Sequence, residues 1–307
     1  MKVADIVFWH DEPVSFGSGL CQQLLRHEMC AAAIATPYDH AGVLRILQQS
    51  KSDCVVFISP HMHADFIRCH HKELLALGKP LLGIVSEWVA GNDIFPHLRN
   101  FHLERDWLHY YGAMQASDAT WLRSLGMKAD FIRMMFASDL FAASPHHGRR
   151  KQICYIGHNN AWKTERIRIV QTLDQAGLIC SFSAPRNLVG ANGIAALFRE
   201  FSAVLCPPAH GRAHSIRCYE AASAGALLIE CQPLDDGNEF FIDGQHRITF
   251  PVGMPQQDMC DFVRSIDHDK ARHIAEAGRA LAHQECRAEV GFSRFLNAAR
   301  EALTEAQ

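Results

Sequence analysis

The sequence predicts an α/β protein of two doubly wound domains, each with a parallel sheet covered by helices on both faces. Short, nearly continuous apolar runs alternate with longer helical patterns, which is typical of parallel strands that are buried on both sides. The alternation stops at residues 142–151, a stretch rich in Pro, Gly, His and basic residues, and then starts again. The length of 307 residues suits two domains.

The first half contains four clear strands with helices between them. The expected strands are Val3–Trp9, Cys30–Thr36, Asp53–Ser59 and Pro80–Val85. The expected helices are Leu20–His27, Ala41–Gln49 and Ala64–Leu77, the last of which ends at Gly78. No element is expected between Trp88 and Leu108. The pattern resumes with Gly112–Ala116 and Ala129–Met134 as strands, and with a helix near Asp118–Leu125.

The second half repeats the alternation. The expected strands are Gln152–Ile156, Leu178–Ser183, Ala203–Cys206, Ala226–Ile229 and Arg247–Phe250. The expected helices are Trp162–Ala176, Asn192–Glu200 and one that starts at Ser215, and the chain is expected to be helical from Pro255 onward. These elements predict a first domain at 1–141, a linker at 142–151 and a second domain at 152–290. Residues 291–307 are expected to form a helix that can pack back on the first domain.

Composition excludes several classes of protein. A net charge of −3 argues against a general nucleic-acid binder, which needs a basic face. No run of 18 apolar residues occurs, so no membrane span is expected, and the N-terminus is interpreted as a first strand rather than a signal peptide. The eleven cysteines are odd in number, form no C-x-x-C and often lie in apolar runs, so we expect reduced thiols in a cytoplasmic protein.

The segment 202–230 is the most informative motif. A short strand, a basic loop with Arg212 and His214, and a helix that starts at Ser215 follow one another. A helix N-terminus attracts anions, and Arg217 in the first turn is unfavourable unless an anion compensates it. Glu220, one turn further, can reach a sugar hydroxyl beside that anion. The alternative is an ordinary crossover helix with a surface arginine and a solvated Glu220.

A second set of cations follows the strand at 152–156. Lys163 and Arg166 come after a glycine-containing loop, near the start of a helix, where two cations suit a diphosphate. The alternative is solvated charge on a helix that also carries Glu165 and Arg168.

Further candidates lie at strand ends of the first half. Phe16, Gly17, Ser18 and Gly19 are expected to form a loop whose amides approach a ligand, or simply a tight turn. His10 and Glu87 follow the first and fourth strands, where carboxyl ends face the ligand crevice, and they are candidates for catalytic roles. The histidines around His61, His63 and His70 lack zinc spacing, so we expect surface or helix-end histidines and no metal site.

The segment R-C-Y-E-A-A-S-A-G-A at 217–226 resembles the R-x-F-E-x-x-A-x-G-A segment of GT-B glycosyltransferases, in particular the CgeB-like (spore-maturation) group. Residues Tyr155 to Asn159 with Lys163 and Arg166, residues 117–141, and the late helix at Ala275–Arg279 also resemble that family. The resemblance covers about residues 115–300. It implies two Rossmann-like domains that face a cleft, the first on the acceptor side and the second binding the nucleotide sugar.

The resemblance also implies a function, a retaining transfer of a sugar from a nucleoside-diphosphate sugar such as a UDP-sugar. The donor-binding residues that it implies are Gly157, His158, Asn159, Lys163, Arg166, Arg212, His214, Ser215, Arg217 and Glu220, with Glu220 on the ribose. Arg217, Lys163, Glu87 and His10 are the catalytic candidates. Arg212 stands where many relatives carry the first glutamate of an E-x7-E motif, so the role of that glutamate is open here.

Fixed cations and a helix N-terminus can stabilise the diphosphate leaving group, so we expect no metal and no cofactor other than the nucleotide sugar. The acceptor is open between a glycan, a protein, a lipid-linked sugar and a modified nucleobase. Two alternatives stay open, a sugar-nucleotide epimerase on the same fold and a non-catalytic nucleotide-sugar-binding protein.

Overall fold

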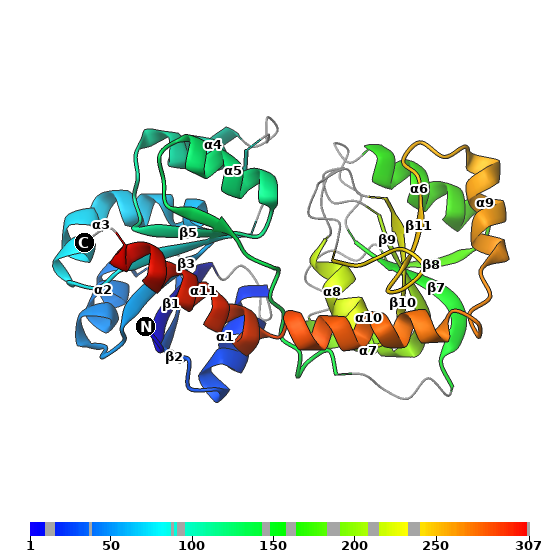
Figure 1. Ribbon diagram of the computed structural model, residues 1–307, viewed down its shortest axis with the longest axis horizontal. Coiled ribbons are helices and arrows are strands. Elements are labelled where there is room, and N and C mark those ends of the chain that lie inside the picture. Colours follow the sequence, from blue (N-terminus) through cyan, green and yellow to red (C-terminus); the bar gives the residue numbers. More distant parts are fainter. Residues whose placement is uncertain are drawn as a thin grey trace. The chain divides into compact units, whose positions relative to one another are not determined.

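The computed structural model describes residues 1–9, 16–36, 39–86, 89–90, 96–142, 148–157, 164–182, 191–207, 215–232 and 240–305. The chain divides into two compact units, Met1–Met135 with Ala288–Gln307 (unit 1) and Phe136–Arg287 (unit 2). Each unit is built on one parallel sheet with helices on both of its faces (Figure 1). The predicted fold class is thereby confirmed.

The sheet of unit 1 has the strand order β2-β1-β3-β4-β5-β6, and its neighbouring strands are parallel. Its strands are β1 (Ala4–Trp9), β2 (Cys30–Thr36), β3 (Cys54–Ile58), β4 (Leu81–Val85), β5 (Tyr110–Ala113) and β6 (Ala129–Phe131). Every residue of β3, β4 and β5 is buried, because helices cover both faces. This explains why these strands are continuous apolar runs in the sequence.

The helices of unit 1 form two layers. They are α1 (Phe16–Arg26), α2 (His40–Gln49), the 3₁₀ helix η1 (Pro60–His63), α3 (Ala64–Ala76), α4 (Pro96–Glu104), α5 (Ala116–Ser124) and α11 (Ala288–Thr304). Side chains of α2, α3, α4 and α5 form one hydrophobic core with the sheet. The helix α11 packs on β5 and on α1, and it buries Phe292, Phe295 and Leu296.

The sheet of unit 2 has the order β11-β10-β9-β7-β8, again with parallel neighbours. Its strands are β7 (Arg150–Ile156), β8 (Ile179–Phe182), β9 (Phe201–Cys206), β10 (Leu227–Cys231) and β11 (Ile248–Phe250). Its helices are α6 (Thr164–Gln175), α7 (Ala191–Glu200), α8 (Ile216–Ser223), α9 (Gln256–Ser265) and α10 (Arg272–Glu285). One face is covered by α6 and α9, and the other by α7, α8 and α10 (Figure 1).

Three expectations about elements were wrong. The helix α1 begins at Phe16, so the residues expected to form a glycine loop, Phe16 to Gly19, form its first turn. The helix α4 lies where no element was expected. The expected linker 142–151 runs into β7, which begins at Arg150, and Arg149 is buried. Within the described ranges, none of the helices has both the length and the apolar character that crossing a membrane requires.

Candidate functional site

The candidate ligand site lies at the carboxyl edge of the unit 2 sheet, where the strand order reverses. The chain leaves β7 through α6 toward β8, and it leaves β9, the other neighbour of β7, through α8 toward β10. Open α/β sheets bind ligands outside the strand carboxyl ends at such a switch point. Both predicted donor-binding segments follow these two strands, so the topology brings their described parts to one edge.

Gly157 ends the first of these strands. A Cβ atom on Gly157 would lie 2.5 Å from the hydroxyl oxygen of Tyr155, so only glycine lets the backbone pass over this ring. The Arg166 guanidinium donates a hydrogen bond to the Tyr155 hydroxyl. Burial raises the pKa of Tyr155, and Arg166 acts in the opposite direction.

Arg166 lies in the first turn of α6 but is only 9% exposed. Its Nη2 donates to the carbonyl of Pro207, the residue after β9, at 3.4 Å. Burial lowers the pKa of Arg166. This predicted diphosphate ligand thus connects the ends of β7 and β9 across the switch point, which makes it a residue that shapes the site as well as one that charges it.

The N-terminus of α8 is the second half of the site. Ser215 occupies the N-cap position with extended backbone angles, as predicted, but its side chain makes no capping hydrogen bond to the helix backbone. Its hydroxyl instead lies 3.7 Å from the sulfur of Cys218. The amides of a first helical turn have no partner within the helix, so α8 presents donors at this edge of the sheet.

Arg217 and Glu220 form an ion pair on α8, three residues apart. The Arg217 side chain is 34% exposed and that of Glu220 is 7% exposed, so Glu220 is not the solvated residue of the alternative interpretation. Burial raises the pKa of Glu220, while the charge of Arg217 and its hydrogen bond lower it. Arg217 therefore has a partner that is itself a predicted ligand-binding group, and an incoming diphosphate would compete for it.

The other end of α8 is held by a buried cation. Gly225 adopts a left-handed conformation with φ of +79°, as the sequence suggests for a helix stop. Arg149 donates to the carbonyls of Ala224, Phe198 and Phe201, at the C-terminal ends of α8 and α7 and at the start of β9. Helix C-termini stabilise cations. Arg149 was assigned to a linker in the sequence analysis, and nothing local to that stretch indicated this role.

Sequence reasoning also missed a buried ion pair behind α8. Arg247 donates to Glu230 in β10 at 2.6 Å, and the two side chains are 5% and 1% exposed. The thiol of Cys218 donates to the other oxygen of Glu230 at 3.3 Å. A glutamate within the apolar run 226–231 was the available signal, but its partner 17 residues away could not be read from spacing.

Several predicted site residues lie outside the described residues. These are His10, Glu87, His158, Asn159, Lys163, Arg212 and His214. Their assignments stay predictions. Of Phe16 to Gly19 the structure gives only the backbone, in α1, so the expected ligand-binding loop is not found there.

The histidines singled out in the sequence include buried ones. His61 and His63 lie in η1 after β3 and are 5% and 2% exposed, so the expectation of surface histidines was wrong for both. The rings of His61 and His102 lie with centroids 6.1 Å apart, and their nitrogens have no hydrogen-bond partner. Among the described residues, no group of three or more His, Cys, Asp or Glu side chains is placed to hold a metal ion.

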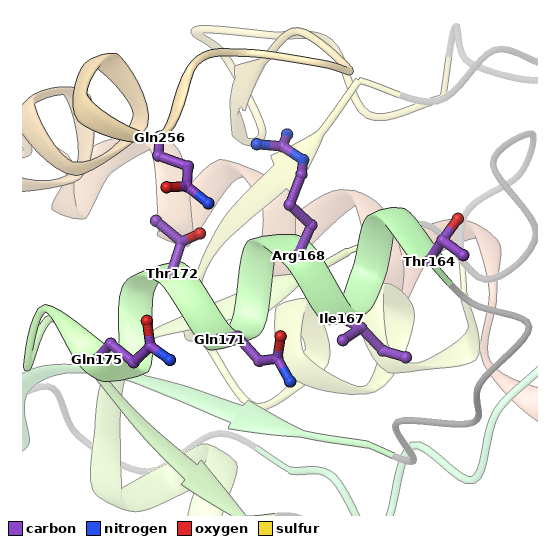
Figure 2. Close-up of a pocket in the computed structure, with 7 residues that line it drawn as sticks. All are labelled: Thr164, Ile167, Arg168, Gln171, Thr172, Gln175 and Gln256. Carbon is purple, nitrogen blue, oxygen red and sulfur yellow. The ribbon is translucent and has the colours of Figure 1, made fainter.

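A shallow hollow of 310 Å³ lies elsewhere, on the outer side of α6 and α9. Figure 2 shows glutamine and threonine side chains around it, with Arg168 at its rim. Arg168 is held by Glu165 and by the carbonyl of Met254. None of the predicted donor-binding residues lines this hollow.

Comparison with known proteins agrees with this site. Residues 146–296 match the family model described as glycosyl transferase-like, a range that contains most of unit 2 and the start of α11. Compared by sequence alone, no curated protein matches the chain.

Solved structures match nearly the whole chain. Anabaena Alr3699/HepE in complex with UDP-glucose matches with a TM-score of 0.62 at 13% identity, covering 98% of this chain and 99% of that one. Sucrose-phosphate synthase from Thermosynechococcus elongatus matches with a TM-score of 0.64 at 10% identity, covering 99% and 100%. The avilamycin A biosynthesis glycosyltransferase AviGT4 matches with a TM-score of 0.58 at 11% identity, covering 98% of each chain.

The fold of the chain is therefore the GT-B fold, and its C-terminal unit carries a glycosyltransferase domain. The predicted class of enzyme, a glycosyltransferase, is confirmed. The CgeB-like subgroup stays a prediction.

Proposed function

We propose that the protein transfers a glycosyl group from a UDP-sugar to an acceptor, with retention of configuration and without a metal ion. The observation that carries this proposal is the N-terminus of α8 at the switch point, with Arg217 and the buried Glu220 on its first turns. It lies within the residues that match the glycosyl transferase-like family. UDP is favoured as the nucleotide because HepE has been solved with UDP-glucose and with UDP and glucose.

In this reaction the bond between the sugar C1 and the diphosphate breaks, and UDP leaves with the electron pair. The acceptor oxygen forms the new bond to C1 and loses its proton. Negative charge grows on the diphosphate, and only groups that bind it better in the transition state accelerate the step. The first amides of α8 and the Arg217 guanidinium are fixed donors of the required kind. Glu220, released from Arg217, would accept hydrogen bonds from the ribose hydroxyls.

Metal independence is part of the proposal. Arginines and a helix N-terminus can neutralise the leaving group without a divalent ion. Activity that survives EDTA would agree with this. Activity that EDTA abolishes and that magnesium or manganese restores would contradict both the metal independence and the assignment of Arg217 to the leaving group.

The acceptor is proposed only by class, as a hydroxyl-bearing glycan or glycoside. One match, TarM of S. aureus, with a TM-score of 0.61, has been solved with fondaparinux, α-GlcNAc-glycerol and UDP. Protein, lipid-linked and nucleobase acceptors remain outcomes of an acceptor screen.

Calorimetry with UDP, GDP, ADP, CDP and TDP tests the donor assignment, and we expect UDP to bind. Failure of all five ligands at millimolar concentration would contradict a nucleotide-sugar enzyme. Incubation with UDP-glucose alone then separates the reaction classes. Slow hydrolysis supports a transferase, a new sugar isomer would indicate an epimerase, and binding without turnover would indicate a sensor.

A further inference from the structure

Four polar side chains form a continuous line of contacts behind the first turn of α8. Arg247 donates to Oε2 of Glu230 at 2.6 Å, and the Cys218 thiol donates to Oε1 at 3.3 Å. The Cys218 sulfur lies 3.7 Å from the Ser215 hydroxyl oxygen. Arg247, Glu230 and Cys218 are buried, whereas Ser215 lies at the edge of the sheet. The line thus joins β10 and the start of β11 to the N-cap of α8.

The direction of each hydrogen bond follows from the chemistry of the groups. A carboxylate only accepts and a guanidinium only donates, so Glu230 accepts from both Arg247 and Cys218. Because the thiol proton is used on Glu230, the sulfur is the acceptor and the Ser215 hydroxyl the donor in their contact. Successive hydrogen bonds of this kind polarise one another. The orientation of the Ser215 hydroxyl is therefore set from inside the sheet.

This orientation changes what the helix end can bind. An N-cap serine ordinarily accepts from the amide at the second or third helical position, which here belongs to Arg217 or Cys218. Ser215 makes no such bond, and the Cys218 amide donates to the Ser215 carbonyl at 3.0 Å instead. The side chain that would compete with an anion for the first amides is thus held toward the protein interior.

We propose that Glu230 and Arg247 are positioning residues for the donor diphosphate, acting through Cys218 on Ser215 and on the first turn of α8. The inference rests on the proposed function, because it takes this turn as the diphosphate site. A buried ion pair is seldom more stabilising than apolar side chains of similar volume, so stability alone does not account for it.

Cys218 offers the cleanest test, because changing Glu230 or Arg247 would leave a buried charge unpaired. Cys218→Ala removes the link, and Cys218→Ser restores both a donor for Glu230 and an acceptor for Ser215. We expect calorimetry to show UDP binding about three- to tenfold weaker in Cys218→Ala, as for one lost hydrogen bond, and within about twofold of wild type in Cys218→Ser. Cys260→Ala, a buried cysteine in the core under α9, is the matched control and should leave UDP affinity unchanged. Cys218→Val fills more of the space without a polar group and replaces the alanine variant if that variant does not fold.

A double-mutant cycle separates positioning from general loosening of the fold. In the Ser215→Ala background, Cys218→Ala should cause no further loss of UDP affinity, because the route runs through Ser215. Equal losses in both backgrounds, or a serine variant as weak as the alanine variant, would overturn the inference. UDP binding that Cys218→Ala leaves unchanged would overturn the inference and leave the proposed function standing. A wild-type protein that binds no UDP would overturn both.

Discussion

Arg217 is the residue on which the proposed chemistry depends most directly. Arg217→Ala should lower kcat with a UDP-sugar by about 10²–10³-fold, which is the usual cost of removing one fixed donor to a developing charge. Its ion pair with Glu220 is partly exposed on the Arg217 side, so the free energy of unfolding should change by about 1 kcal/mol or less.

The matched control is Arg264→Ala, which removes the arginine of another i,i+3 pair, with Asp261 on α9. This variant should keep full activity. An Arg217→Ala enzyme with wild-type kcat, measured at saturating donor, would refute the assignment to the leaving group.

Glu220 should matter for donor binding rather than for folding. Glu220→Ala removes a buried carboxylate whose pKa is raised by its burial, and this loss relieves a desolvation cost while it breaks the pair with Arg217. We expect UDP affinity to fall by about 1.5–3 kcal/mol, the usual contribution of hydrogen bonds to a charged group. Calorimetry and thermal unfolding check this together, with Glu276→Ala, from an exposed pair on α10, as the control. Unchanged UDP affinity would show that Glu220 is only a structural partner of Arg217.

At the scale of elements, Arg149 fixes the C-terminal ends of α7 and α8. Arg149→Ala should lower the free energy of unfolding by about 2–4 kcal/mol, because three carbonyls lose a charged donor. Urea unfolding of Arg149→Ala is compared with that of Arg150→Ala, an exposed neighbour that pairs with Glu200. Equal stability of the two variants would contradict the role of Arg149 as a joint cap.

The elements best predicted from the sequence are the strands, and the reason is physical. Strands such as β3 and β4 are buried on both faces, so every position is apolar and the signal needs no register. The start of α1 was missed because Gly17 and Gly19 favour a turn locally, whereas packing of Leu20 and Leu24 determines that the helix forms.

The candidate site was predictable only in part. The α8 N-terminus and Glu220 were recognisable because cap, charge and helix spacing are local features. The links Arg166–Pro207 and Glu230–Arg247 join residues from different strands and helices, and no local pattern contains them. The helix α4 had one local signal, Pro96 at its first position, which the sequence analysis did not use.

For the molecule as a whole, buried histidines should make unit 1 sensitive to acid. Burial lowers the pKa of His61 from 6.5 to about 3, and it lowers the pKa values of His63 and His102 to about 4. Below pH 6.5 the unfolded chain binds protons that the folded chain resists, so stability falls as pH falls. Each histidine should cost about 1.4 kcal/mol per pH unit between its unfolded and folded pKa values.

Urea unfolding between pH 7 and pH 4.5, followed by tryptophan fluorescence, measures this slope, since the rings of His102 and Trp121 lie 6.2 Å apart. His102→Phe should make the slope shallower by about one histidine, while a variant of the exposed His273 in unit 2 should leave it unchanged. A stability that is flat over this range would show that the three rings take up protons as readily when folded as when unfolded.

The return of the chain to unit 1 through α11 has a consequence for synthesis. The strands β1–β6 are complete by Phe131, but the helix that buries Phe292, Phe295 and Leu296 against β5 and α1 begins only at Ala288. At about 5–20 residues per second, the ribosome needs roughly 8–30 s to make the intervening chain. During that interval unit 1 presents an uncovered apolar face on β5, while unit 2 can fold from its own contiguous residues. The nascent unit that emerges first is thus completed last, and a chaperone that binds exposed apolar surface has its substrate in the interval between.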